Sequence, residues 1–227
     1  MFDGIAKRYD LLNRLTSMGL DRQWRQKAID ALNLTTGQTL LDLAAGTLDI
    51  SIAANQKYPG IQIIAADPSR QMLEEGLQKC PPHNTDSTIT VVQSTGEHLP
   101  LAPKSIHAAI IAFGIRNFSD RAAALKQLSM SLVPGGRLVI LELSLHGRGL
   151  LAPLASAYVR TVIPLLGRLL SKGAAYTYLP ESMQKFPPPV KFARELAAAD
   201  FELINIVPFL SGTCNLFVSE SRGESAN

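Results

Sequence analysis

The sequence is poor in cysteine and in charge, and it has no long apolar run. Its two cysteines, Cys80 and Cys214, lie far apart and outside any metal-ligand spacing, so we expect free thiols in a reducing compartment and no metal site. No stretch of about 18 apolar residues occurs, so no membrane-spanning helix is predicted. The N-terminal stretch MFDGIAKRYD lacks the apolar core of a secretory signal, and the net charge of +3 is too small to indicate nucleic-acid binding. We therefore expect a cytoplasmic protein that binds no nucleic acid.

What the sequence has in abundance is apolar patterning. Of its 227 residues, 46% are hydrophobic, which is enough for one α/β domain with an insertion. Strands are predicted over 39–45, 61–67, 88–94, 106–113 and 137–144, and helices over 49–58, 69–79 and 119–132, followed after residue 189 by a helix and two closing strands. We expect Ser69 and Ser119 to cap their helices. The alternation predicts a mostly parallel sheet with helices on both faces.

Two segments stand outside this alternation, within a single domain predicted over 1–227. Residues 1–35 form a predicted helical arm, and residues 145–189 a predicted insert of one or two helices and a loop. Ligands of open α/β sheets bind beyond the carboxyl ends of the strands, and these two segments are available to cover that crevice.

The insert also has an unusual composition. Its stretch GLLAPLASAYVRTVIPLLGRLLSKG is rich in leucine and has basic residues but no acid. That pattern suits docking on anionic membrane lipid. The alternative is a helix packed on its own core or on a second subunit of a homodimer.

The stretch LLDLAAGTLDISIAA, residues 40–54, predicts a strand-to-helix turn with one glycine, Gly46. Dinucleotide sites use several glycines so that the backbone can approach a pyrophosphate, and such a site is therefore disfavoured. Asp67 ends the next strand, 25 residues after Asp42, where an acid can accept hydrogen bonds from both ribose hydroxyls of an adenosine. The alternative for Asp67 is a surface acid that caps a helix.

A phosphate-free adenosine that carries a cation fits these features, and S-adenosylmethionine is such a ligand. Asp42 or Asp49 would suit the sulfonium or the amino group electrostatically.

Further stretches occur in the order of one family: MFDGIAKRYDLLNRLTSMGLDRQWR, LDLAAGTLDIS, STGEHLPLAPKS, FGIRNFSDRAAAL, LVPGGRLVILELS, YTYLPESMQKFP and ADFELINIVPFLSGTCNLF. The chain resembles the ubiquinone/menaquinone biosynthesis C-methyltransferases over about residues 1 to 218. That resemblance implies the class I methyltransferase fold, with a seven-stranded sheet whose last strand runs antiparallel. It also implies S-adenosylmethionine-dependent methylation of a prenylated quinol ring carbon.

The resemblance implies a cofactor site as well. Asp67 would bind the ribose, Gly46 and Thr47 would form the turn under the ligand, Thr95 would flank the adenine, and Phe113 would line the cofactor. The chain departs from the family at Ala45 and Leu48, where further glycines are usual. Leucine adds four carbons where the methionine moiety would lie and is expected to keep φ negative, which predicts weaker binding or a shifted turn.

By the same resemblance, Arg116 and Asn117 of FGIRN would face the substrate. A ring carbon is nucleophilic only in the reduced quinol, and more so once the phenol loses its proton. Arg116 is a poor base, but it can stabilise the phenolate or hold a water that takes the proton. The alternative is a surface ion pair. Tyr178 would contact the substrate oxygen or cover the pocket, and core packing is its alternative.

Two other functions stay open from the sequence. The first is a methyltransferase of the same frame that acts on a different small-molecule acceptor. The second is a non-catalytic family member whose cofactor turn has decayed, which the leucine in the turn would favour.

Overall fold

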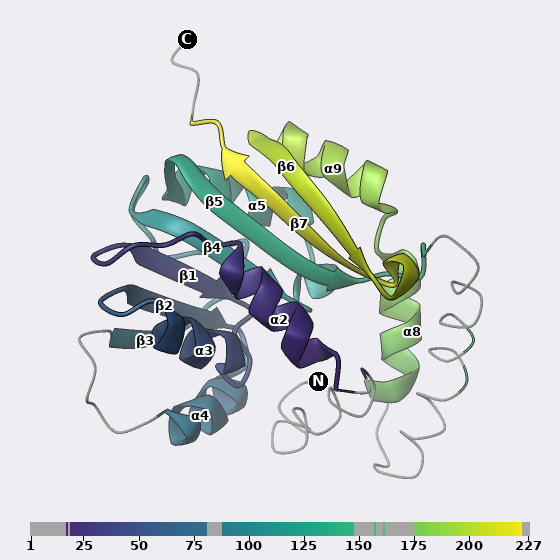
Figure 1. The fold of residues 1–227 in the computed structure, drawn as a ribbon, viewed down its shortest axis with the longest axis horizontal. Coiled ribbons are helices and arrows are strands. Elements are labelled where there is room, and N and C mark those ends of the chain that lie inside the picture. Colours follow the sequence, from purple (N-terminus) through teal and green to yellow (C-terminus); the bar gives the residue numbers. More distant parts are fainter. Residues whose placement is uncertain are drawn as a thin grey trace.

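A computed structural model of the chain describes residues 17, 19–80, 88–147, 157, 161 and 175–223 (Figure 1). Its sheet has seven strands in the order β3-β2-β1-β4-β5-β7-β6. They are β1 (Thr39–Leu43), β2 (Gln62–Asp67), β3 (Thr88–Gln93), β4 (Ile106–Ala112), β5 (Leu132–Leu143), β6 (Phe201–Phe209) and β7 (Cys214–Ser221). Strands β1 to β5 pair in parallel, and β7 runs antiparallel to both β5 and β6. The predicted seven-stranded, mostly parallel α/β fold with a closing antiparallel strand is confirmed.

Helices cover both faces of this sheet (Figure 1). They are α2 (Asp21–Asp30), α3 (Asp49–Lys57), α4 (Arg70–Lys79), α5 (Arg121–Ser131), α8 (Ala175–Lys185) and α9 (Pro189–Ala198), with short 3-10 turns η2 (Ile115–Asn117) and η4 (Leu210–Gly212). One core cluster joins the sheet to α2 and α3, and the other joins it to α5 and α9. Two faces packed in this way explain why the central strands are nearly continuous apolar runs.

The cap of α5 and the start of β5 differ from the prediction. Ser69 caps α4 as predicted, because its hydroxyl accepts the N–H of Met72 at 3.2 Å. The cap of α5 is Asp120, one residue after the predicted Ser119, because its carboxylate accepts the N–H of Ala123 at 3.0 Å. Strand β5 begins at residue 132 instead of 137 because that residue already pairs with β4 across a local register shift.

Part of the predicted arm belongs to the core. Trp24, Ala28 and Ile29 of α2 are buried in the same cluster as residues of β1 and β4, and the Trp24 ring stacks on Phe209 with the ring centroids 5.9 Å apart. Residues 1–16 and 18 lie outside the described residues.

Most of the predicted insert also lies outside the described residues, including Arg148, Arg160, Arg168 and Lys172. Its described parts are residues 145–147, 157 and 161 and helix α8. Among the helices that the structure describes, none has both the length and the hydropathy needed to cross a bilayer.

The conformation of Leu48, in the turn after β1, differs from the one that the sequence predicts. Its φ is +63°, so the expectation of a negative φ is wrong. Its side chain is fully buried and packs with Ala65 and Leu73, between β2 and α4. The four extra carbons therefore fill the core beneath α4. Room for them comes from Gly76 of α4, where a Cβ would lie 2.4 Å from Leu48 Cγ.

We predict that Gly76→Ala lowers the free energy of unfolding by about 1–2 kcal/mol, because overpacking outweighs the roughly 1 kcal/mol that alanine gains in a helix. The added methyl would also meet the backbone carbon of Thr47 at 2.8 Å, which cannot move as a side-chain tip can. Urea unfolding of both proteins measures the change. Gln78→Ala, at an exposed position of the same helix, is the control and should change little. A Gly76→Ala protein as stable as wild type would contradict this close packing.

Candidate active site

The candidate site lies at the carboxyl edge of the sheet, where the strands β1 to β5 end (Figure 1). Asp42 lies in β1, Gly46 and Thr47 in the turn after it, Asp67 at the end of β2, Thr95 just after β3, and Phe113, Arg116 and Asn117 just after β4. The fold therefore brings eight of the nine expected site residues to one edge. Tyr178 lies in α8, and its side chain is outside the described residues.

Asp67 ties the turn after β1 to the end of β2. One carboxylate oxygen accepts the N–H of Gly46 at 2.9 Å, and the other accepts the N–H of Ser69 at 2.8 Å. Only 8% of Asp67 is exposed, and the cap of α4 is Ser69, so Asp67 is not a surface helix cap. Each carboxylate oxygen can accept more than one hydrogen bond.

The backbone of the turn after β1 closely approaches the backbone that follows β4. Ala44, Gly46 and Leu48 all have positive φ, which places the chain in a conformation that glycine adopts without strain. A Cβ on Gly114, just after β4, would lie 2.4 Å from the Cβ of Ala44. The ends of β1 and β4 thus meet where no further side chain fits. Such a backbone cradle suits a ligand that lies across the two strand ends.

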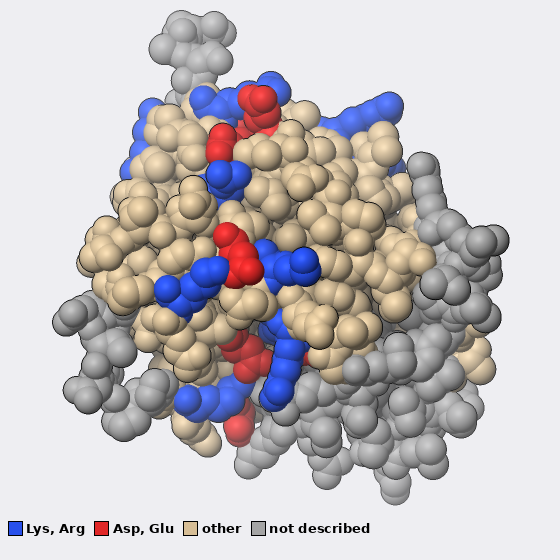
Figure 2. Space-filling model, in the orientation of Figure 1, with Lys and Arg blue, Asp and Glu red and all other residues tan. Residues whose placement is uncertain are grey.

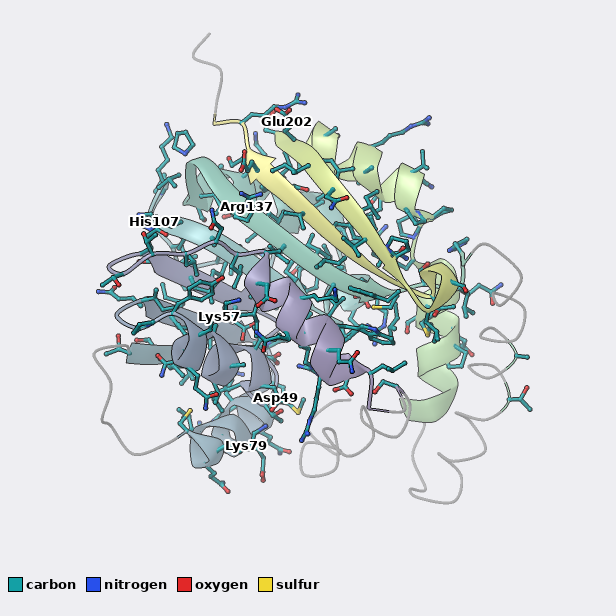
Figure 3. The ribbon with its side chains drawn as sticks, in the orientation of Figure 1. Asp49, Lys57, Lys79, His107, Arg137 and Glu202 are labelled. Atoms are coloured by element: carbon teal, nitrogen blue, oxygen red, sulfur yellow. The ribbon has the colours of Figure 1, made fainter. Side chains whose placement is uncertain are left out.

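Two acids near the turn differ in their surroundings. Asp42 is buried and accepts a hydrogen bond from the Ser51 hydroxyl at 2.6 Å. Burial raises the pKa of Asp42 to about 6, against the opposing effects of the Ser51 hydrogen bond and the Arg25 charge. Asp49 instead forms an ion pair with Lys79 at 2.7 Å, which links α3 to α4 (Figure 3). Asp42 is therefore the acid whose charge is less compensated.

Phe113 directly follows β4, and its side chain packs toward α2. Its N–H donates to the carbonyl of Leu141 at 2.8 Å, and its φ is +60°. The guanidinium carbon of Arg25 lies 5.3 Å from the centre of its ring. The ring belongs to the core cluster of α2 and α3.

Arg116 forms a buried ion pair with Glu142 of β5. Its Nη1 lies 2.5 Å from Glu142 Oε1, and its backbone N–H donates to Oε2 at 3.1 Å. Nη1 also donates to the Phe113 carbonyl at 2.6 Å, and Nε donates to the Ser182 hydroxyl of α8 at 3.3 Å. The side chains of the pair are 7% and 0% exposed. Arg116 therefore forms an ion pair, as the alternative prediction states, but this pair is buried and does not lie on the surface. Catalysis by Arg116 stays a prediction.

Thr95 and Asn117 lie at the rim. Thr95 is exposed, with its hydroxyl oxygen 3.4 Å from Nδ1 of His98. Glu97, in the same loop, accepts the N–H of Asp120 at 3.1 Å and so ties the loop to the start of α5. Asn117 is half-buried in η2, and its N–H donates to the Gly114 carbonyl.

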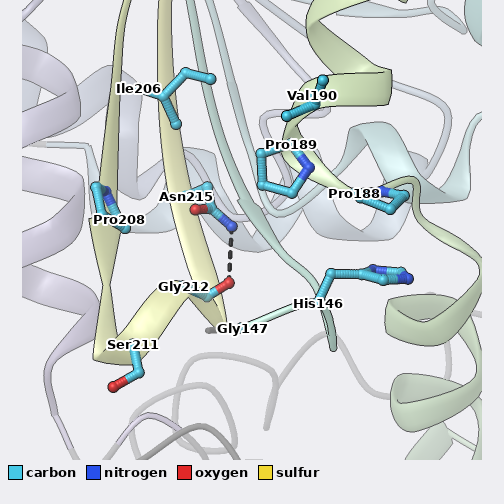
Figure 4. A pocket seen from close by; sticks show the side chains of 10 residues that line it. All are labelled: His146, Gly147, Pro188, Pro189, Val190, Ile206, Pro208, Ser211, Gly212 and Asn215. Carbon is cyan, nitrogen blue, oxygen red and sulfur yellow. Dashed lines mark hydrogen bonds between the residues drawn. The ribbon is translucent and has the colours of Figure 1, made fainter. Parts of the chain in front are cut away.

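An apolar hollow of about 650 Å³ lies beside this edge, where the end of the β6–β7 hairpin meets the start of α9 (Figure 4). It is lined by His146, Gly147, Pro188, Pro189, Val190, Ile206, Pro208, Ser211, Gly212 and Asn215. Asn215 pairs in register with Glu142 across β5 and β7. The hollow is therefore one strand away from the Arg116–Glu142 ion pair.

Sequence reasoning missed Glu142 and Arg25. A signal for Glu142 was present, since it is the one acid in the apolar strand LVILEL and a buried acid usually has a partner. Arg25 follows Asp21 by one helical turn, a spacing that is also common on exposed helix faces.

Comparisons with known proteins show which family and which structures this chain resembles. The sequence model of the ubiE/COQ5 methyltransferase family matches residues 1–220. The chain is 42% identical to a ubiquinone/menaquinone biosynthesis C-methyltransferase of Syntrophotalea carbinolica, covering 96% of this chain and 91% of that one. It is 38% identical to a demethylmenaquinone methyltransferase of Thermus thermophilus, covering 89% of this chain and 92% of that one.

Solved structures show the same fold at low identity. A putative methyltransferase in complex with the Haloferax volcanii Trm112 activator superposes with a TM-score of 0.68 at 12% identity, over 99% of this chain and 98% of that one. An S-adenosylmethionine-dependent methyltransferase from Aquifex aeolicus gives 0.57 at 16% identity, over 86% and 88%. The fold is that of class I methyltransferases.

We predict that Asp42→Asn changes how stability depends on pH. The folded-state pKa of Asp42 lies near 6, above its ordinary value of 3.8, so between these values the folded protein binds the proton more tightly than the unfolded chain. Wild type should therefore lose stability, relative to the variant, as pH rises from about 4 to 7, by about 3 kcal/mol. Urea unfolding across this range measures the difference.

Asp30→Asn is the control for this series. The hydrogen bond from Lys57 lowers the pKa of Asp30, so its relative effect should have the opposite sign. Parallel pH curves for wild type and Asp42→Asn would contradict the raised pKa.

Proposed function

The chain belongs to the ubiE/COQ5 methyltransferase family, and on that premise we propose that it methylates a ring carbon of a prenylated quinol with S-adenosylmethionine. The observation that carries the proposal is the family match over residues 1–220, together with relatives whose names specify ubiquinone/menaquinone or demethylmenaquinone methylation. The class of enzyme, a methyltransferase, agrees with the fold.

The residues of the edge fit the cofactor. Asp67, at the end of β2, accepts hydrogen bonds from the ribose hydroxyls, and the Gly46–Thr47 backbone lies beneath the methionine part. Thr95 flanks the adenine, and Phe113 lines the site from the end of β4. When bound, S-adenosylmethionine supplies a methyl group that is activated by the sulfonium charge. The burial of Leu48 beneath α4 supports a working turn over a decayed one.

Arg116 stabilises the phenolate of the acceptor. A guanidinium has five N–H donors, and the contacts with Glu142, Phe113 and Ser182 use the two on Nη1 and the one on Nε. No described residue accepts from Nη2, so two donors stay available for a substrate oxygen. Glu142 holds the guanidinium in place through its fixed position in β5. Asn117 lies in the same short turn as Arg116 and also contacts the acceptor.

Helix α8 covers the acceptor side. Ser182 of α8 meets Arg116, and Tyr178 lies one helical turn earlier, where it contacts the acceptor oxygen. The apolar hollow beside Glu142 suits the start of the prenyl tail. The leucine-rich, basic insert docks the protein on anionic lipid at the inner face of the membrane, where the tail resides; a homodimer contact is the competing use of that segment.

The test is methyl transfer from labelled S-adenosylmethionine to a reduced demethylmenaquinol and to a reduced benzoquinol, with the oxidised quinones as controls. Product should form only with reduced rings, because the phenolic oxygen must donate electron density to the attacking carbon. Tight cofactor binding without methylation of either ring would favour a different acceptor. Absence of cofactor binding in calorimetry would favour the non-catalytic alternative.

We predict that Arg116→Ala lowers kcat by about 10²–10³ and leaves the Kd for S-adenosylmethionine nearly unchanged, because the negative charge on the phenol develops in the transition state. Arg116→Lys should recover only part of the rate, since it keeps the charge but loses the planar fork. The wild-type rate should rise with pH until the bound phenol is ionised.

Arg121→Ala provides the matched control, because this arginine of α5 forms a half-buried ion pair with Glu195. Its turnover should stay close to wild type. Circular dichroism checks folding, since Arg116→Ala leaves Glu142 buried without its partner. Near-full turnover of Arg116→Ala would remove Arg116 from the chemistry and point to Tyr178 or His98.

A further inference from the structure

Arg25 of α2 lies at the carboxyl edge of the sheet, although it is not among the predicted site residues. Because α2 runs antiparallel to β1, its first turns lie at the edge where the parallel strands end (Figure 1). The Arg25 guanidinium lies over the Phe113 ring at the end of β4, and its Nη1 is 4.0 Å from a carboxylate oxygen of Asp49 at the start of α3. Arg25 thus stands between the β4 end and the helix that follows the turn.

Within the described part of the chain, the guanidinium of Arg25 forms two long ion pairs, and its Nε lacks a hydrogen-bond acceptor. Its side chain is 14% exposed, and its Nε is buried without any hydrogen-bond partner. The distances to carboxylate oxygens of Asp21 and Asp49, 3.7 and 4.0 Å, are too long for hydrogen bonds. Both acids already have closer partners, the Ser17 hydroxyl at 2.6 Å and Lys79 at 2.7 Å. Nearly buried guanidinium groups normally have hydrogen-bond acceptors, so Arg25 has capacity for a further, more closely placed anionic partner.

The surroundings of Arg25 carry charges of both signs. A groove of about 380 Å³ between α2 and α3 is lined by Asp21, Arg22, Arg25, Gln26, Ile29, Asp49, Ile52, Ala53, Gln56 and Lys79. Figure 2 shows acidic and basic side chains gathered together over this part of the surface. Beneath them, burial raises the pKa of Asp42 and the charge of Arg25 acts against that rise. A cation with only long ion pairs, beside a buried acid, matches a zwitterion, whose carboxylate and ammonium need opposite charges.

We propose that Arg25 binds the α-carboxylate of the methionine half of S-adenosylmethionine. The inference rests on the proposed function, since it deepens the cofactor site. A guanidinium matches a carboxylate through two parallel N–H donors, and Arg25 has its buried Nε and its remaining donors for that purpose. Asp42 supplies the negative charge that the neighbouring ammonium requires. Arg25 is a binding residue, with no part in the transfer of the methyl group.

The test compares S-adenosylmethionine with its decarboxylated form, which keeps the sulfonium and the amino group and lacks only the carboxylate. In calorimetry, wild type should bind the intact cofactor about ten- to a hundredfold more tightly. Arg25→Ala should weaken binding of the intact cofactor by a similar factor and leave that of the decarboxylated form within about threefold. Arg22→Ala, at an exposed position in the same groove, is the matched control and should keep the wild-type preference.

Other results would overturn the inference. Equal wild-type affinities for the two ligands exclude a carboxylate contact, even if Arg25→Ala fails to fold. Equal weakening of both ligands by Arg25→Ala or Arg25→Lys shows that Arg25 only supports the turn. Failure of the wild type to bind either ligand overturns the proposed methyltransferase function as well, whereas tight binding without quinol methylation affects only the choice of acceptor.

Discussion

The carboxylate of Asp67 accepts two backbone N–H groups, one from Gly46 and one from Ser69, and so holds the turn after β1 against the start of α4. Three residues of that turn have positive φ, two of which are not glycine. Such conformations cost roughly 1–3 kcal/mol each and persist only where the surroundings enforce them. The buried carboxylate and the packing of Leu48 beneath α4 provide that enforcement. The shape of the edge, and with it the proposed cofactor site, depends on this contact.

Two arginines at this edge, Arg116 and Arg25, differ in how closely acids pair with them. Arg116 and Glu142 neutralise each other through close, well-directed hydrogen bonds. Burying two charges in this way is costly unless the geometry is good, and here the pair also fixes η2 between β5 and α8. Arg25 is less well satisfied, since its carboxylate partners lie 3.7 and 4.0 Å away and its Nε has no hydrogen-bond partner. Close pairing thus fixes the position of Arg116, whereas Arg25 keeps capacity for a further anion.

Helix α2 links the core to the edge. Trp24, Ala28 and Ile29 anchor the helix in the cluster that it shares with β1 and β4, whereas Asp21 and Arg25 project toward the strand ends. One short helix thus packs in the core and also holds the long, flexible side chain of Arg25 within reach of the turn. The side chain of Phe113 beneath the guanidinium restricts it further through a cation–π contact.

Local patterns in the sequence determined the alternation of strands and helices, the parallel sheet, the cap at Ser69 and the placement of Asp67 and Gly46 at strand ends. These features follow from side-chain periodicity and from the residue types that end strands, which are properties of neighbouring residues. The tertiary structure alone decided that Leu48 takes a positive φ, that Arg116 pairs with Glu142 and that Arg25 reaches Phe113. Glu142 lies 26 residues beyond Arg116, and the room for Leu48 comes from Gly76 in another helix. No local pattern encodes which distant residue will lie opposite, because packing of whole elements settles that contact.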